Sequence, residues 1–427
     1  MFARPASPLR ANFRHLYADT FWYGVLSGST LSFLGVYVAR LEASSLQIGL
    51  LTAGPAVINL LFSLPAGRWL EQRSFLKSTF WSAVLFRLGY LVFIPLPALF
   101  SATNQTQTII AVTLSMAVPG VILAIAFNAT LAQTVPSDYR GEVVGKRNAL
   151  LAVSTTVSML ISGQILDRLA FPSNYQWVFA IGAAGAVLST YHLWRLRPLK
   201  PFTPPGNGRP IGGLARPGML RFFDGVRTVT GLRFLTRSAG RPLLRLDLLR
   251  GGFGAFLFAY LVFYSFQYVP IPLLPLFMVG DLHLSDGAIS LGNGLFYLTM
   301  FFTSLRVTQW SASFGHRALA VTGALSYCIY PLLVGLARDS SLFWLGSLLG
   351  GVSAALLLSG MTNRLMETAS AEDRPAYMAL HNLVLNLGIL IGSFSGPWLG
   401  EAIGLRDAIL MSAGLRLVAG FVLWRLI

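Results

Sequence analysis

Polar side chains that could bind a solute recur at helical spacing within apolar stretches of this sequence. Between residues 251 and 280, Tyr260, Tyr264, Gln267 and Tyr268 fall at positions i, i+4, i+7 and i+8, so they share one face of a helix. Three prolines follow between positions 270 and 275, where the helix should break. This face either presents phenol and amide groups to a solute or packs its rings against neighbouring helices.

Amides, phenols and hydroxyls occupy other apolar stretches in the same way. Asn382 and Asn386 are four residues apart, on the side opposite a row of glycines that begins at Gly388. Buried amides need hydrogen-bond partners, which a solute or a second amide can supply. The candidate solute-binding residues are Tyr23, Ser27, Asn59, Asn128, Tyr264, Gln267, Tyr268, Asn293, Tyr297, Asn382 and Asn386.

Charged side chains are scarce in the apolar stretches, and we expect no Asp or Glu at the middle of one. Arg87 and Arg416 do lie mid-stretch; at roughly 2.5–3.5 kcal/mol each in a membrane, both should have partners. We expect structural hydrogen bonds for both, with an anionic solute as the alternative. The candidates for a proton or anion site are Asp19, His381, Arg306 and Arg364.

The sequence offers no chemistry typical of an enzyme. It has one cysteine, Cys328, which excludes an internal disulfide and a cysteine metal cluster. We find no catalytic triad and no phosphate-binding loop, and we expect neither a metal nor a cofactor, although proton coupling stays open.

Composition predicts an all-α membrane protein. Hydrophobic residues make up 54% of the 427 positions and charged residues only 11%, whereas soluble domains carry roughly 25% charged residues. A membrane-spanning helix needs about 20 apolar residues. We predict twelve: 17–40, 46–66, 78–99, 107–135, 147–167, 175–196, 251–280, 286–308, 317–337, 341–363, 377–400 and 407–427.

The chain repeats itself. The stretch from Asp138 to Asn148 recurs in degenerate form from Glu372 to Asn382, so that Arg140 corresponds to Arg374. The apolar helices that follow end in an acid at the same register, Asp167 and Glu401. Parallel repeats of this kind indicate two membrane units with a site between them. We expect charge networks around Arg140 and Arg374 that break and re-form as the units rock.

The net charge of +16 reflects topology more than nucleic-acid binding. With the N-terminus inside, only Arg40, Arg168, Arg338 and Arg406 fall on the outer side, and both termini are cytoplasmic. The basic stretch 219–245 alternates Arg with apolar residues, which predicts an amphipathic helix on anionic lipid. A regulatory or partner-docking helix is the alternative. We expect no nucleic-acid partner and a monomer in the cell inner membrane.

Six plus six helices, a basic central loop and the repeated loop resemble the major facilitator superfamily. The best local marker is the stretch Gly67-Arg-Trp-Leu-Glu71-Gln-Arg73, in which Gly67 and Glu71 match the family motif, while Ser74 stands where a second Gly belongs. In the family this acid latches the two halves, so the resemblance implies a gating role for Gly67, Glu71 and Arg73.

A second family-like pattern lies between residues 377 and 400. Gly388, Gly392 and Gly396 are four apart and Pro397 follows, which allows close helix packing and a bend. Drug-proton antiporters of the superfamily carry a similar motif in helix 5, whereas here helix 11 carries it. Tight packing and a hinge for alternating access are both open.

The resemblance implies a two-bundle transporter with three parts: an N-terminal six-helix half (1–197), a basic linker (198–250) and a C-terminal six-helix half (251–427). A path lined by amides, phenols and aromatic rings suits a neutral or lipophilic small molecule, hence efflux. The alternatives are uptake of an organic anion at Arg306 or Arg364, and a membrane sensor or lipid-handling protein of the same fold that transports nothing.

Overall fold

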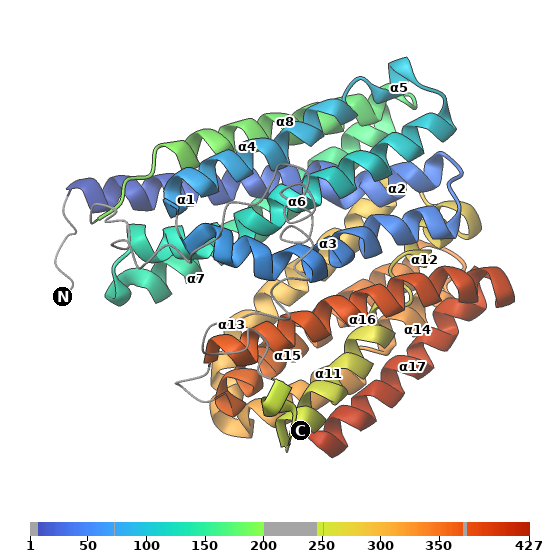
Figure 1. Cartoon of the computed structure of the whole chain (residues 1–427). Helices are drawn as coiled ribbons and strands as arrows, with labels where there is room; N and C mark the ends of the chain where they lie inside the picture. The colour runs from blue at the N-terminus through green and yellow to red at the C-terminus, as the bar shows by residue number, and fades with distance from the viewer. Residues whose placement is uncertain (1–6, 72, 200–245, 251, 370–373) are drawn as a thin grey trace, which may run out of the picture.

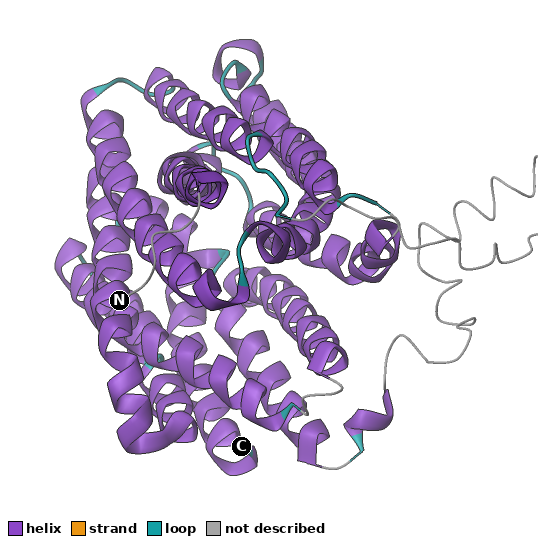
Figure 2. Cartoon of the chain, turned by 90° about the vertical axis from the view of Figure 1, so that its left-hand side faces the viewer, coloured by secondary structure: helices purple, strands orange, loops and turns teal. Residues whose placement is uncertain are grey.

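The computed structural model describes residues 7–71, 73–199, 246–250, 252–369 and 374–427. Throughout this part the chain is helical, and helices joined by short loops make up the molecule (Figure 2). The helices of the first half are α1 (Ser7–Leu26), η1 (Ser27–Leu31), α2 (Ser32–Arg40), α3 (Ser45–Glu71), α4 (Phe75–Phe93), α5 (Leu96–Leu99), α6 (Ala102–Thr134), α7 (Ser137–Arg168) and α8 (Ser173–Trp194). Those that follow are η2 (Leu246–Leu249), α11 (Gly252–Tyr268), α12 (Leu273–Leu276), η3 (Phe277–Asp281), α13 (Asp286–Ser326), α14 (Ile329–Leu336), α15 (Ser340–Thr368), α16 (Arg374–Ile403) and α17 (Leu405–Leu426).

The prediction of an all-α membrane protein is confirmed. The described residues include 10 helical stretches long and apolar enough to cross a membrane. One of them, Asp286–Leu336, turns at Gly315, whose φ of 81° is open to glycine but strained for other residues. It therefore holds two of the predicted spans. The short helix α4 matches one more, so all twelve predicted segments are helical.

The first and seventh predicted spans depart most from regular helix. The first begins at Ser7 rather than residue 17, and a π-helical turn, Ser27–Leu31, separates α1 from α2. In the seventh, α11 ends at Tyr268, just before the run of prolines, and the chain resumes as α12. A helix that stops inside a predicted membrane span leaves its last carbonyl groups without intrahelical donors, so donors from other parts of the chain must satisfy them.

The helices form two groups (Figure 1). Those of the first half (blue to green) lie above those of the second (yellow to red), and the two groups run roughly side by side. Across the boundary α3 packs against α16, and α7 packs against α13. The repeat relates these two pairings, since α16 is the counterpart of α7. Each of these two helices packs against a helix of the opposite half.

We name the two ends of the bundle by the loops they carry. The terminal side holds the start of α1, the α3–α4 loop and the α6–α7 turn, whereas the distal side holds the α2–α3, α7–α8 and η3–α13 connections (Figure 1). The predicted amphipathic stretch 219–245 lies outside the described residues.

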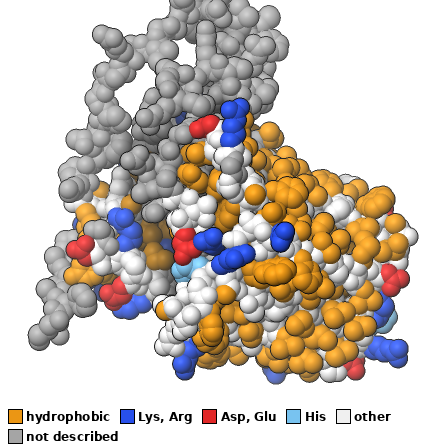
Figure 3. Space-filling view, turned by 90° about the horizontal axis from the view of Figure 1, so that it is seen from below, with side chains coloured by type: hydrophobic (Ala, Val, Ile, Leu, Met, Phe, Trp, Pro, Cys, Tyr) orange, Lys and Arg blue, Asp and Glu red, His pale blue; other side chains and the backbone are white. Residues whose placement is uncertain are grey.

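The outer surface suits a lipid environment. Large apolar side chains are exposed on it, among them Trp81 (62%), Trp177 (61%) and Trp398 (68%). Figure 3 shows hydrophobic side chains over much of one described face, interrupted by few charged ones. In water such a surface would drive aggregation, whereas in lipid it lies against apolar chains.

Candidate functional site

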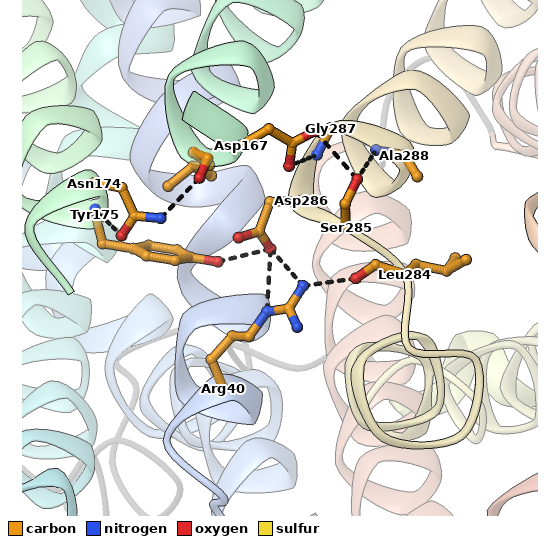
Figure 4. A network of polar contacts seen from close by, with 10 residues as sticks. Arg40, Asp167, Asn174, Tyr175, Leu284, Ser285, Asp286, Gly287 and Ala288 are labelled. Carbon is orange, nitrogen blue, oxygen red and sulfur yellow. Dashed lines mark hydrogen bonds and ion pairs between the residues drawn. The ribbon is translucent and has the colours of Figure 1, made fainter. Parts of the chain in front are cut away.

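A polar network joins the two halves at the distal side (Figure 4). The Arg40 guanidinium at the end of α2 contacts the Asp286 carboxylate at 3.1 Å and donates to the Leu284 carbonyl at 2.6 Å. Tyr175 of α8 donates its hydroxyl to the same Asp286 oxygen at 3.0 Å. Asp286 is only 7% exposed, so its charge depends on these two partners.

The acid that ends α7 caps a helix of the opposite half. Asp167 accepts from the Gly287 backbone N–H at 2.9 Å and from the Ser285 hydroxyl at 3.1 Å. These donors lie at the N-terminus of α13, where free N–H groups and the helix dipole favour a carboxylate. Deeper along the interface, Ser290 donates to the Met159 carbonyl at 3.0 Å.

The repeat places a second acid in the corresponding position. Glu401, near the end of α16, accepts from the Ser45 hydroxyl at 3.1 Å, and Ser45 is the first residue of α3. Asp167 and Glu401 therefore each reach the start of a helix in the other half. The two acids that correspond in the repeat thus make corresponding contacts, and residues of both repeats hold the distal side together.

The largest of the described cavities opens between the halves toward the terminal side. It has a volume of about 660 Å³ and is formed by α3, α6 and α16. Three amides line it, Asn59, Asn128 and Asn382, together with apolar side chains such as Leu64 and Met378. The Asn59 and Asn128 amides each donate to a carbonyl of their own helix, which leaves their amide oxygens for a solute.

A second cavity, of about 420 Å³, lies nearer the distal side. It is lined mainly by α2, α3, α4 and α6, and the opposite half adds Ile271 and Pro275 from the broken seventh span. Its lining is largely apolar, with Tyr90, Ser32, Thr52 and Thr113 as polar members.

A third cavity, of about 290 Å³, lies within the N-terminal half and holds a buried charge cluster. Asp19 contacts Arg87 at 3.6 Å and Arg147 at 3.7 Å, and it accepts from the Ser189 hydroxyl at 2.6 Å. Thr20, also on the wall, accepts from the Arg147 Nε at 2.7 Å.

This cluster corrects the expectation that Asp19 lies near a helix end. Because α1 begins at Ser7, Asp19 falls past its midpoint and is only 3% exposed. Arg87 was expected to make structural hydrogen bonds; it does donate to Thr190 at 2.9 Å, and it also forms an ion pair with this carboxylate at 3.6 Å. Asp19 thus contradicts the prediction that no acid lies inside a span.

Arg416 fits the expected structural role. It is 1% exposed and donates to the Gln267 carbonyl at 2.8 Å and the Tyr327 carbonyl at 3.4 Å, with its guanidinium 4.4 Å from the centre of the Tyr327 ring. Gln267 is in the last turn of α11, so its carbonyl has lost its intrahelical donor. Arg416 supplies that donor at the break.

The other predicted binding residues are dispersed. Tyr23 lines the N-terminal cavity, whereas the Tyr264 hydroxyl lies 3.1 Å from His381 and is buried. Asn386 is buried and donates to the Asn382 carbonyl at 2.8 Å. Ser27, Gln267, Tyr268, Asn293 and Tyr297 are not among the residues that line the three cavities.

Neither arginine predicted for an anion lines these cavities. Arg306 is exposed and reaches Gln309 at 3.4 Å, and Arg364 donates to the Ile427 carbonyl and to Glu367, each at 3.1 Å.

The predicted gating residues have varied surroundings. Gly388, Gly392 and Gly396 pack so tightly on α11 and on Val269, the residue after it, that an added β-carbon would meet their atoms at 2.1–2.5 Å. Pro397 lies inside α16 and against Gly49 of α3. Gly67 borders the largest cavity.

Among the described residues, the contacts recorded for Arg73 and Arg140 lie within their own half. The Arg73 guanidinium lies over the Trp69 ring at 4.2 Å, and Arg140 donates to the Ala132 and Val135 carbonyls. The side chains of Glu71 and Arg374 lie outside the described part of the chain.

Sequence reasoning did not single out Arg40, Asp286 and Tyr175, and it placed Arg147 in a charge network near Arg140 without pairing it with Asp19. Arg40 and Asp286 flank loops, where charge is ordinary in a membrane protein, so only their meeting across the two halves marks them. Arg147 had a detectable signal: it occupies the position of His381 in the repeat, next to Asn148, which lines the N-terminal cavity.

Comparison with known proteins agrees with this architecture. The chain is 28% identical to "Multidrug resistance protein 1" of Bacillus subtilis (strain 168) over 131 residues, and 27% identical to "Multidrug resistance protein 2" of the same organism over 149 residues. These alignments cover 31% and 35% of this chain, and 33% and 37% of the relatives.

Solved transporters share the fold over their full length. The nucleoside transporter NupG superposes with a TM-score of 0.68 at 14% identity, covering 97% of this chain and 98% of that one. A D-xylose-proton symporter gives 0.69 at 16% identity, covering 99% and 98%. A family model described as Major Facilitator Superfamily matches residues 20–269 and 256–427. The chain is therefore a multi-pass membrane protein that belongs to the Major Facilitator Superfamily.

Proposed function

We propose that this transporter exports a lipophilic or neutral small molecule from the cell by alternating access. The observation that carries the proposal is that the largest described cavity and the contacts that join the two halves lie toward opposite sides of the bundle. A cavity of about 660 Å³ is shared by both halves toward the terminal side, while hydrogen bonds and an ion pair between the halves gather at the distal side. This arrangement supports solute entry from the terminal side, while the contacts between the halves hold the distal side together.

The lining of this cavity supports the solute class. Apolar side chains of α3, α6 and α16 surround three amides, and none of the described lining residues is charged. A pocket of this composition holds an apolar body and orients it with a few hydrogen bonds. The two Bacillus subtilis relatives are named for multidrug resistance, which favours export.

In the proposed topology the terminal side faces the cytoplasm and the protein lies in the cell inner membrane. The tally of Arg and Lys in the loops supports this orientation. A proton is the proposed coupling ion, with Asp19 and His381 as its candidate carriers, because intramembrane ionisable groups commonly serve as relays. In this scheme the solute enters at Asn382 and leaves after the Arg40–Asp286 contact opens.

Transport into inverted membrane vesicles tests the proposal directly. Vesicles that contain the protein should accumulate a lipophilic fluorescent dye when energised, and a protonophore should abolish this uptake. Accumulation equal to that of vesicles without the protein, for dyes and neutral drugs alike, would contradict export and favour a non-transporting role.

A cross-link across the distal side tests alternating access separately. Ser45 and Glu401 approach to 3.1 Å, so cysteines at both positions, in a Cys328→Ser background, should react with a short bifunctional thiol reagent. Cross-linked vesicles should lose transport and regain it when a cleavable linker is reduced. Unchanged transport after complete cross-linking would refute movement at this side.

A further inference from the structure

We propose that the cavity inside the N-terminal half binds an anionic group of the solute, such as a carboxylate on an apolar body, between Arg87 and Arg147. The proposal rests on the export function above and narrows the solute to a lipophilic molecule that carries an anionic group. The site is formed by α1, α4, α6, α7 and α8, all from one half.

The charges around this cavity do not balance. Among the described residues, the charged side chains that line it are Asp19, Arg87 and Arg147, one carboxylate against two guanidinium groups. Arg87 is 7% exposed, and the Arg147 side chain is 16% exposed. A net positive charge at this depth is costly unless a further anion joins it.

The existing contacts leave donor capacity unused. The distances from Asp19 to the two guanidinium groups, 3.6 and 3.7 Å, exceed those of direct hydrogen bonds. The Nε of Arg87 is buried with no hydrogen-bond partner among the described residues. Guanidinium groups hold carboxylates through paired donors, so a second carboxylate would use groups that Asp19 leaves free.

The cavity also provides space for an apolar body. Its volume of about 290 Å³ is near the lower end of ligand pockets, roughly 300–1,000 Å³. Phe86, Leu123, Phe127 and Leu151 form much of its wall. The Arg147 guanidinium lies 4.5 Å from the centre of the Phe127 ring, which places charge and apolar surface side by side.

The site adjoins the central path. Ala124 of α6 borders both this cavity and the largest one, and Phe86 of α4 borders both this cavity and the one nearer the distal side. A solute in the central path could therefore place its charged end in the N-terminal half. The opposite polarity, a cation at Asp19, is disfavoured because two guanidinium groups already flank that carboxylate.

Three compounds with one skeleton and different charge test the proposal. Naphthaleneacetate, naphthaleneacetamide and naphthaleneethylamine are titrated into the purified full-length protein in detergent, and each Kd is measured by calorimetry. The carboxylate should bind about tenfold or more tightly than the neutral amide, and the amine most weakly. Arg147→Gln should reduce the preference for carboxylate over amide to within about twofold.

Two further variants control this measurement. Arg195→Gln removes an exposed charge just after α8, outside the cavity, and should keep the preference. Arg147→Lys retains the positive charge and should keep part of the preference for carboxylate over amide. This result would show that Arg147→Gln loses the preference through the missing charge and not through misfolding.

Each contrary outcome has a defined meaning. Equal binding of acid and amide, tighter binding of the amine, no binding of any compound, or a preference that survives Arg147→Gln would overturn the proposal. The wild-type comparison decides even if a variant fails to fold. If inverted vesicles accumulate lipophilic dyes but the protein binds carboxylate and amide equally, the proposed function stands and only this anion site is overturned. If the protein prefers the carboxylate but the vesicles accumulate no dye, only the proposed export function is contradicted.

Discussion

The Arg40 guanidinium lies 3.1 Å from the Asp286 carboxylate, and this ion pair joins the last residue of α2 to the first residue of α13 in the opposite half. Tyr175 donates to the same carboxylate. Beside this contact, Asp167 caps the start of α13 and Glu401 meets the start of α3. Charges and helix ends of both halves therefore take part in the distal closure, beside a buried apolar cluster that also contains residues of both halves.

Arg40→Gln should weaken the distal closure. The Arg40 side chain is 26% exposed, so the loss should be about 1 kcal/mol, or about a fivefold shift of the equilibrium toward a state open at this side. Spin labels on cysteines at the exposed positions Ser44 and His283, in a Cys328→Ser background, should report a larger fraction of long distances. Arg338→Gln removes an exposed distal charge as the control; equal distance distributions for the two variants would count against the ion pair as a latch.

Gly163→Val should prevent the distal side from closing. A β-carbon at Gly163 would lie 2.3 Å from the Ser290 β-carbon and 3.3 Å from the Gly287 α-carbon, both on α13. The halves must then separate at this point, and transport should fall to background. Gly414→Val is the matched control, because Gly414 is also helical but has nothing within 4 Å of its added β-carbon. Transport by Gly163→Val at the control level would mean that this close approach is dispensable.

Asn382→Leu should reduce transport and leave the fold intact. Asn382 lines the largest cavity, and Asn386, which donates to it, keeps the Asn382 backbone carbonyl as a partner at 2.8 Å. Loss of one hydrogen bond to a solute should lower transport about fivefold to tenfold. Asn104→Leu, at an exposed amide outside the cavity, should leave transport unchanged in the same vesicle assay. If both variants transport at the wild-type rate, Asn382 does not contact the solute.

Arg416→Leu should destabilise the protein without abolishing the activity of the folded fraction. The change leaves the Gln267 carbonyl unsatisfied where α11 stops, which should cost about 1–3 kcal/mol of stability. Thermal unfolding in detergent should show a lower Tm than for Arg425→Leu, which removes an exposed arginine from the same helix. Equal Tm values would show that the break in α11 needs no donor from α17.

The glycine row of α16 and the break in α11 are two features that the local sequence pattern predicts correctly. Gly388, Gly392 and Gly396 share a helix face by spacing alone, and they do pack against the neighbouring helix α11. The prolines after Tyr268 stop α11 wherever the helix lies. Apolar length likewise predicted the spans, because a helix in lipid must satisfy its backbone internally whatever its neighbours are.

Residue spacing along the chain does not predict which side chains of different helices pair with one another. Asp19 and Arg87 lie on α1 and α4, and nothing in their spacing predicts an ion pair. The early start of α1 at Ser7 moved Asp19 from an expected helix end to a buried position, since residues before position 17 are too polar to read as part of a span but continue the helix on the terminal side. The same holds for Gln267 and Arg416, which a broken helix brings together.

By itself the sequence determined that this chain is a membrane protein of two related helical units, because hydropathy and repetition are properties of residues in order. It also marked Asp167 and Glu401 as equivalent. Only the tertiary structure decided that these acids reach across to the other half, that Arg40 meets Asp286, and that Arg87 and Arg147 share one carboxylate. The physical reason is that helix formation in lipid is local, whereas the pairing of charges depends on which helices pack together and at what depth.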